Sequence, residues 1–341
     1  MKWCRKRMKN RMLCLLSAAV FMSGCGSVKA PEPEAEPLEV ADESLIVVGV
    51  SQLGSESVWR TANSASIQRV FTKENGFFLN FKNARQKQEN QIKAIRSFIS
   101  QQVDYIIFSP VTEEGWDTVL LEAKEAGIPV ILMDRMVKVE DESLYTAWVG
   151  SDFEEEGEKA GQWLADHLEK EARQEEEIHI VVLRGTEGSS STIGRTKGFS
   201  RIAAAQENWK ILEEGDGEFT TAKGKEVMEN FLEKYEDIDV VVSQNDDMTF
   251  GALEAIEEAG KTVGTDGEII MISFDAVKAA LEMVEEGIIN VDIECNPEQG
   301  EYIEEVIRKI EQGEEPDKLN YVSENVFTRE NVSDFIDERI Y

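Results

Sequence analysis

The chain has 341 residues, of which 68 are acidic and 36 basic, so its formal net charge at pH 7 is −32. This excess of negative charge excludes a nucleic-acid-binding surface built on Lys and Arg, and it repels anionic lipid. Hydrophobic residues make up 41% of the chain, enough to fill the cores of two domains of ordinary size. The acids spread over predicted helices, as in Glu154, Glu155 and Glu156, and predict a solvated exterior.

Residues 1–24 have the plan of a secretory signal peptide. Six Lys or Arg residues and no acid precede residue 12, and an apolar run of twelve residues follows at 12–23. This run is shorter than the ~20 residues that a membrane-spanning helix needs. Its removal takes away six basic and no acidic side chains, which brings the charge from −32 to −38. We therefore expect an extracytoplasmic mature protein without a transmembrane helix.

The apolar run ends in the sequence MSGC at 22–25, which resembles the lipobox of bacterial lipoproteins. By that resemblance Cys25 becomes the acylated first residue, and the lipid alone holds the protein to the membrane. The alternative is an ordinary signal peptide cut nearby, with Cys25 incidental. Residues 25–43, which include the lipidated Cys25, are rich in Pro and Glu and predict an extended linker. Only Cys295 would remain as a free thiol, so no intrachain disulfide is predicted.

From residue 45 onward, short apolar runs alternate with helical periods, and the pattern restarts after residues 145–150. Continuous apolar strands joined by helices predict a parallel sheet covered on both faces. The fold class is therefore α/β, with two doubly wound parallel-sheet lobes. Strands are predicted at 45–50, 77–81, 105–108, 129–133, 178–183, 240–243, 269–274 and 290–293, and helices at 58–75, 86–101, 115–126, 154–170, 193–206, 221–234, 246–259 and 277–286.

Unusual polar residues follow the carboxyl ends of five of these strands. In doubly wound sheets ligands bind at strand ends, so we expect the five loops to open on one crevice between the lobes. The residues that these loops carry are Trp59, Asp134, Arg135, Arg195, Asn245 and Asp275.

This set of side chains suits a sugar. Carboxylates accept hydrogen bonds from adjacent hydroxyls, Arg donates in a planar fork, Asn does both, and an aromatic ring covers the C–H face. Each residue also has a structural alternative. Asp134 and Arg135 can form an ion pair, Asn245 can cap a helix, and Trp59 can belong to the core.

At these residues the chain resembles the periplasmic sugar-binding proteins of ABC importers, of the ribose-binding type, which have the type I periplasmic binding protein fold. Within that family it is most similar to the members that bind galactofuranose. The similarity runs from about residue 45 nearly to the C-terminus. The segments that carry it are SQLGSESVWR (51–60), QKQENQIKAIRSF (86–98), Asp134-Arg135, GRTKGF (194–199), GKEVME (224–229) and QNDDM (244–248).

The resemblance implies a monosaccharide ligand, with galactofuranose the first choice, and ten residues that line it. Gly194 and Ala276 depart from the family, which has an acid and usually Gly at these positions, and the first departure is expected at the rim of the pocket. The implied ligand-binding residues are Glu56, Ser57, Trp59, Arg60, Asp134 and Arg135 from the first lobe, and Arg195, Phe219, Asn245 and Asp275 from the second.

The resemblance also implies that the chain crosses between the lobes three times, near Ser151, Cys295 and Leu319. The first lobe then comprises residues 44–151 and 296–319, and the second comprises 152–295 and 320–341. The implied partners are the permease subunits of an ABC importer, and the implied state is a monomer.

A sugar sensor of the same fold, docking on a membrane receptor or histidine kinase, is the main alternative to the importer role, because both would use closure of the lobes. A carbohydrate-active enzyme is a weaker alternative that would use Glu56, Asp134 and Asp275 as acid and base. Neither His167 nor His179 has neighbours that suggest a catalytic triad, and no phosphate, zinc or redox motif appears. We therefore expect no catalysis, no cofactor and no metal.

Overall fold

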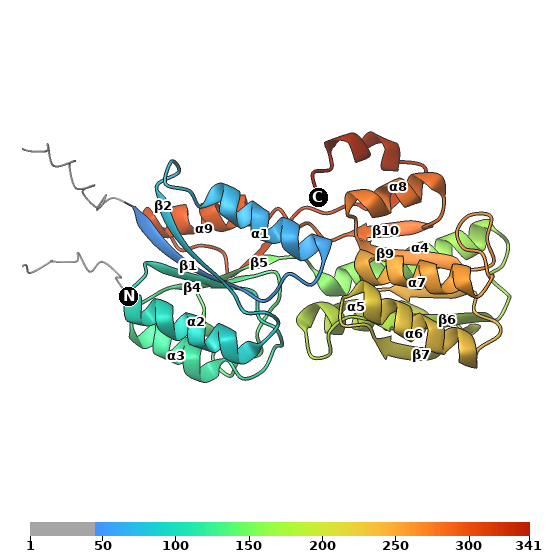
Figure 1. Ribbon diagram of the computed structural model, residues 1–341, viewed down its shortest axis with the longest axis horizontal. Coiled ribbons are helices and arrows are strands. Elements are labelled where there is room, and N and C mark those ends of the chain that lie inside the picture. The colour runs from blue at the N-terminus through green and yellow to red at the C-terminus, as the bar shows by residue number, and fades with distance from the viewer. Residues whose placement is uncertain (1–44) are drawn as a thin grey trace, which may run out of the picture. The chain divides into compact units, whose positions relative to one another are not determined.

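Two six-stranded sheets organise residues 45–341, the part of the chain that the structure describes (Figure 1). The structure is a computed structural model of the protein. The predicted signal peptide, Cys25 and the linker to residue 43 lie outside the described residues. Within residues 45–341, no helix is long and apolar enough to cross a membrane.

The first sheet has the order β11-β5-β4-β3-β1-β2, and all of its neighbouring strands are parallel. Alternate side chains of each strand face opposite helix layers: Ile107 packs with α1 and α9, whereas Ile106 and Phe108 pack with α2 and α3. The elements are β1 (Ile46–Gln52), α1 (Val58–Val70), β2 (Phe77–Asn83), α2 (Gln88–Gln101), β3 (Tyr105–Phe108), α3 (Asp117–Glu125), β4 (Val130–Met133), the short helix Glu142–Leu144, β5 (Ala147–Gly150), α9 (Gly300–Glu311) and β11 (Leu319–Tyr321).

The second sheet has the order β12-β10-β9-β8-β6-β7 and is parallel except for β12, which runs antiparallel to β10. Val240 and Val242 face the layer of α4 and α5, and Val241 faces that of α6, α7 and α8. The elements are α4 (Phe153–Lys170), β6 (Ile178–Arg184), α5 (Ser190–Ala203), β7 (Trp209–Asp216), α6 (Thr221–Lys234), β8 (Val240–Ser243), α7 (Asp246–Glu258), β9 (Ile270–Asp275), α8 (Lys278–Glu286), β10 (Val291–Glu294), β12 (Val326–Thr328) and the short helices Val332–Asp334 and Ile336–Glu338. The predicted fold class, two doubly wound α/β lobes, is confirmed.

Four strands and one helix were not predicted from the sequence: β5, β7, β11, β12 and α9. β7 carries Lys210, Glu213 and Glu214 because it is the last strand of its sheet, so it lacks the continuous apolar run of a central strand. β11 and β12 have three residues each, too few for a periodic signal.

The chain passes between the two sheets three times, at residues 151–152, 295–299 and 322–325. The third crossing was predicted near Leu319, which is wrong. Leu319 and Tyr321 lie in β11, which pairs with β5 of the first sheet, so the chain leaves the first lobe only after Tyr321. The predicted start of the final second-lobe segment at residue 320 is corrected accordingly.

Candidate functional site

The carboxyl ends of the strands of both sheets face one cavity. All ten residues expected at the site line it. Phe153, Ser191 and Cys295 complete the wall. The structure therefore brings the whole predicted set together, as the position of the five loops after strand ends led us to expect.

Arg60 is the centre of the first lobe's side of the cavity. Arg60 is 3% exposed. The side chain of Ser57, the N-cap of α1, accepts a hydrogen bond from the backbone N–H of Arg60. Its guanidinium donates from Nε to Glu56 Oε1 at 2.9 Å and pairs from Nη2 with Asp134 Oδ2 at 2.7 Å. Burial opposes the charge of Arg60, but the carboxylates of Asp134 and Glu56 outweigh it and raise its pKa.

Asp134 does not pair with Arg135, so the structural alternative suggested for these two residues is wrong. Asp134 has a left-handed backbone with φ of 60°, and its carboxylate is held by Arg60 and by Ser109, whose hydroxyl donates to Oδ2 at 2.9 Å. Its carbonyl accepts from Trp148 Nε1 at 2.9 Å. These contacts turn the chain sharply at the end of β4 and separate the two neighbouring side chains.

Arg135 has no ion pair among the described residues. Its side chain is buried, Nη1 donates to the Val111 carbonyl at 3.0 Å, and Nε has no partner. The guanidinium carbon lies 5.2 Å from the ring centroid of Phe219, across the cavity wall. Burial, followed by the charge of Arg60, lowers the pKa of Arg135 to about 10, still well above neutral pH. Arg135 is thus a buried cation whose donors are not used up by the protein.

Arg195 plays the central part on the second lobe's side. It is 3% exposed, and Nε donates to Glu156 Oε2 at 2.6 Å while Nη2 pairs with Asp275 Oδ1 at 3.4 Å. Nη1 donates to the carbonyl of Gln244. Burial disfavours its charge, but Glu156, Cys295 and Asp275 together raise its pKa, so the guanidinium stays charged.

Asp275 stands on a strained turn that two buried carboxyls support. Its φ is 106° and that of Ala276 is 60°, a left-handed region that costs a residue with a side chain roughly 1–2 kcal/mol. Asp292 Oδ1 accepts from the Ala276 N–H at 3.1 Å, and Asp246 Oδ2 accepts from the Val277 N–H at 2.8 Å. Asp246 and Asp292 therefore position the loop that carries Asp275.

An aromatic wall completes the cavity. Trp59 is 4% exposed, and its Nε1 donates to the Cys295 carbonyl at 2.5 Å, so it belongs both to the packed interior and to the lining. Phe219 lies against Gly185, where a Cβ atom would stand 1.9 Å from its Cζ. Asn245 caps α7 by accepting from the Met248 N–H at 2.9 Å, as its structural alternative suggested, and it lines the cavity as well.

One sequence-based expectation around the site is wrong. Glu156 is fully buried as the partner of Arg195 and is not part of the solvated exterior. Its spacing from Phe153, Ala160 and Leu164 on the buried stripe of α4 would have indicated this. Gly194 does not itself line the cavity, but a Cβ there would stand 2.6 Å from Phe153, which does, so its predicted effect on the pocket rim stays a prediction.

Comparison with known proteins gives the same picture of the fold. A family model described as a periplasmic binding protein domain matches residues 48–315. The chain is 37% identical over 298 residues to the galactofuranose-binding protein of Escherichia coli (strain K12), across 86% of this chain and 91% of that protein.

Two solved structures are also similar. One is a protein from Mycobacterium smegmatis in complex with β-D-fucofuranose, 42% identical with a TM-score of 0.82, covering 86% of this chain and 95% of the other. The second is the periplasmic component of the arabinose ABC transporter from Shewanella sp. ANA-3, bound to α- and β-L-arabinofuranose. It is 42% identical with a TM-score of 0.80, again across 86% of this chain and 95% of the other.

Proposed function

Because the chain belongs to the periplasmic binding protein family, we propose that its cavity binds a neutral monosaccharide in the furanose form and that the protein delivers it to an ABC importer. The observation that carries the proposal is a pair of buried polar atoms in the wall that lack partners, Glu56 Oε2 and Arg135 Nε. One is an acceptor and the other a donor, and a sugar hydroxyl can satisfy either. Each would otherwise cost about 1–3 kcal/mol.

The polar groups that line the cavity support a sugar as ligand. Three carboxyl groups and three guanidinium groups line the ligand space, so the wall offers both hydrogen-bond acceptors and donors to sugar hydroxyls. The furanose form is proposed because two relatives of solved structure hold furanose rings.

The lining also supports binding without catalysis. Glu56 and Asp134 are held by Arg60. Asp275 pairs with Arg195, although burial raises the pKa of Asp275 well above its ordinary value. A carboxyl acting as a general acid has to hold and release a proton, a role that a fixed guanidinium partner opposes. We therefore propose a carrier and not a glycosidase.

The ring form can be read directly by NMR with galactose labelled with ¹³C at C1, because the furanose and pyranose C1 signals differ. Protein in excess over the sugar is expected to deplete the signals of the free furanose form. The free pyranose forms then convert to the furanose form until most of the sugar is bound. The apparent affinity for free galactose is lowered by its small furanose fraction. Depletion of a pyranose signal alone, with bound sugar retaining that ring, would contradict the furanose proposal.

We also propose that Cys25 carries a lipid that anchors the protein beside its permease. In a bacterial host, Cys25→Ala is expected to lose metabolic labelling by a lipid analogue and to leave the membrane fraction. Uptake of labelled sugar should fall with it, because the carrier is no longer concentrated at the membrane. A Cys25→Ala protein that still incorporates the lipid analogue would disprove the anchor. Sugar uptake that is unchanged when the gene for this protein is deleted would favour the sensor role.

A further inference from the structure

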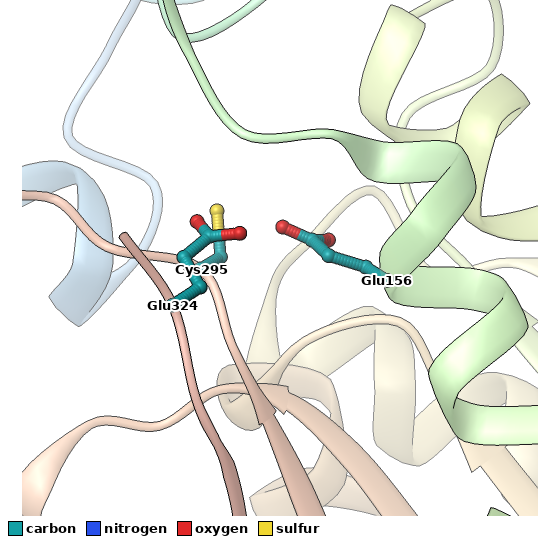
Figure 2. Close-up of side chains that lie close together, drawn as sticks. All are labelled: Glu156, Cys295 and Glu324. Carbon is teal, nitrogen blue, oxygen red and sulfur yellow. The ribbon is translucent and has the colours of Figure 1, made fainter. Parts of the chain in front are cut away.

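A second group of side chains, three buried and one half-buried, gathers where the chain crosses between the two sheets. We call Ser151, Glu156, Cys295 and Glu324 the crossing cluster. Ser151 lies in the first crossing, Cys295 in the second and Glu324 in the third, and Glu156 is in the first turn of α4. The acceptor atoms of Glu156, Cys295 and Glu324 all lie within 4.8 Å of one another (Figure 2).

Direct contacts connect three members of the crossing cluster. Ser151 Oγ lies 3.3 Å from Cys295 Sγ and is hydrogen-bonded to Glu324 Oε1. The Asn296 N–H also donates to Glu324 Oε1, at 2.9 Å. The 3.3 Å between Ser151 Oγ and Cys295 Sγ is the spacing of neighbouring ligands around a tetrahedral ion with bonds of ~2.0–2.3 Å.

Glu156 supplies an independent sign of a ligand. Its side chain is 1% exposed, and Arg195 occupies only Oε2. Oε1 has no hydrogen-bond partner. Figure 2 shows the Glu156 carboxylate directed toward Cys295 and Glu324. A buried carboxylate oxygen without a partner is costly, and a cation placed between these three residues would satisfy it.

The nature of the ligand atoms defines the ion. A thiolate with two carboxylates suits a borderline-soft divalent ion of the zinc class, whereas magnesium and calcium prefer oxygen ligands alone. We propose that Glu156, Cys295 and Glu324, with Ser151 or water as fourth ligand, bind one zinc-class ion that joins all three crossings. The ligand atoms lie up to 4.8 Å apart, so the most widely separated pair has to approach by about 1 Å on binding the ion.

The proposed ion has a local consequence for the cavity. Glu156 also holds Arg195, and Cys295 lines the cavity wall. The ion would therefore fix the Glu156 carboxylate and, through it, the orientation of Arg195. It would also limit the movement of the three crossings. The metal site itself does not depend on which sugar the cavity binds.

Cobalt is a suitable probe, because a Co²⁺–thiolate bond has a near-ultraviolet charge-transfer band. The test uses the full chain with Cys4, Cys14 and Cys25 replaced by Ser, so that Cys295 is its only thiol. After chelator treatment, this protein is expected to bind one Co²⁺ with that band, and Zn²⁺ should displace the cobalt and raise the melting temperature.

Variants identify the ligands. Cys295→Ser should abolish the band, and Glu324→Gln, which keeps the shape of the side chain, should weaken binding at least tenfold. Glu330→Gln, an exposed acid on the same C-terminal segment, should leave binding unchanged. No band in the parent chain, or equal cobalt affinity in Glu324→Gln, would overturn the proposal. Sugar binding is measured separately by calorimetry, so failure of the metal site is distinguishable from failure of the sugar site.

Discussion

Replacing Arg135 with Met is expected to weaken sugar binding by about tenfold to about 150-fold while the sugar-free protein keeps or gains stability. A hydrogen bond from a charged group contributes about 1.5–3 kcal/mol, which corresponds to that loss of affinity. Arg135 has no ion pair to lose among residues 45–341, and burial lowers its pKa, a sign that the fold works against its charge. The free energy of unfolding should stay the same or rise by about 1–2 kcal/mol. Calorimetry and urea unfolding measure the two effects.

Arg195→Met is the matched control, because it removes a buried guanidinium from the opposite wall of the same cavity. It leaves Glu156 and Asp275 buried without their cation, which should cost about 3–5 kcal/mol of stability in addition to sugar affinity. Adding Glu156→Gln should recover part of the stability and none of the affinity. If Arg135→Met destabilised the protein as much as Arg195→Met, Arg135 would be a structural residue and its proposed role would be wrong.

Asp292→Asn is expected to flatten the pH dependence of stability between about pH 4 and 8. Burial raises the pKa of Asp292 to about 8. Burial and the charge of Asp292 also raise the pKa of Asp246. The pair therefore keeps a proton at neutral pH. An acid whose pKa is higher in the folded state stabilises the fold fully below its unfolded pKa of 3.8, and this stability is lost as pH rises through about 8. Between about pH 4 and 8, the free energy of unfolding of the parent should fall by up to about 1.4 kcal/mol per pH unit more than that of the variant.

The substitution is a clean one, because an Asn carbonyl can still accept from the Ala276 N–H and its amide can donate to Asp246. Urea unfolding at several pH values measures the difference between the two proteins. Asp237→Asn, at an exposed position, should follow the parent. Parallel pH curves for the parent and Asp292→Asn would show that no proton is held at this pair.

The lobes and most of the cavity could be predicted from sequence, because central strands are continuous apolar runs and the binding side chains follow them directly. Asp134 and Asp275 each come at or just after the end of such a strand. Which guanidinium holds which carboxylate could not be predicted. Asp134 pairs with Arg60, 74 positions earlier in the chain, because a left-handed turn and Ser109 direct it away from its neighbour.

Other features needed the packed structure for different reasons. Ile303, Val306 and Ile307 have helical spacing, so α9 was detectable, but only its contact with α1 and β5 assigns it to the first sheet. The crossing cluster joins residues 151, 156, 295 and 324, and no local pattern indicates that such distant residues meet.

The charged residues of β7 have a consequence for how copies of the protein meet. β7 is the last strand of its sheet, so one side of its backbone has no neighbouring strand among residues 45–341 (Figure 1). An open edge of this kind can recruit a strand from another molecule and start aggregation. Lys210, Glu213, Glu214 and Asp216 place charges along it, and burying those charges against a second β7 would be unfavourable. The charged residues that interrupt the apolar pattern of β7, and so prevented its prediction, therefore also protect the open edge of the sheet.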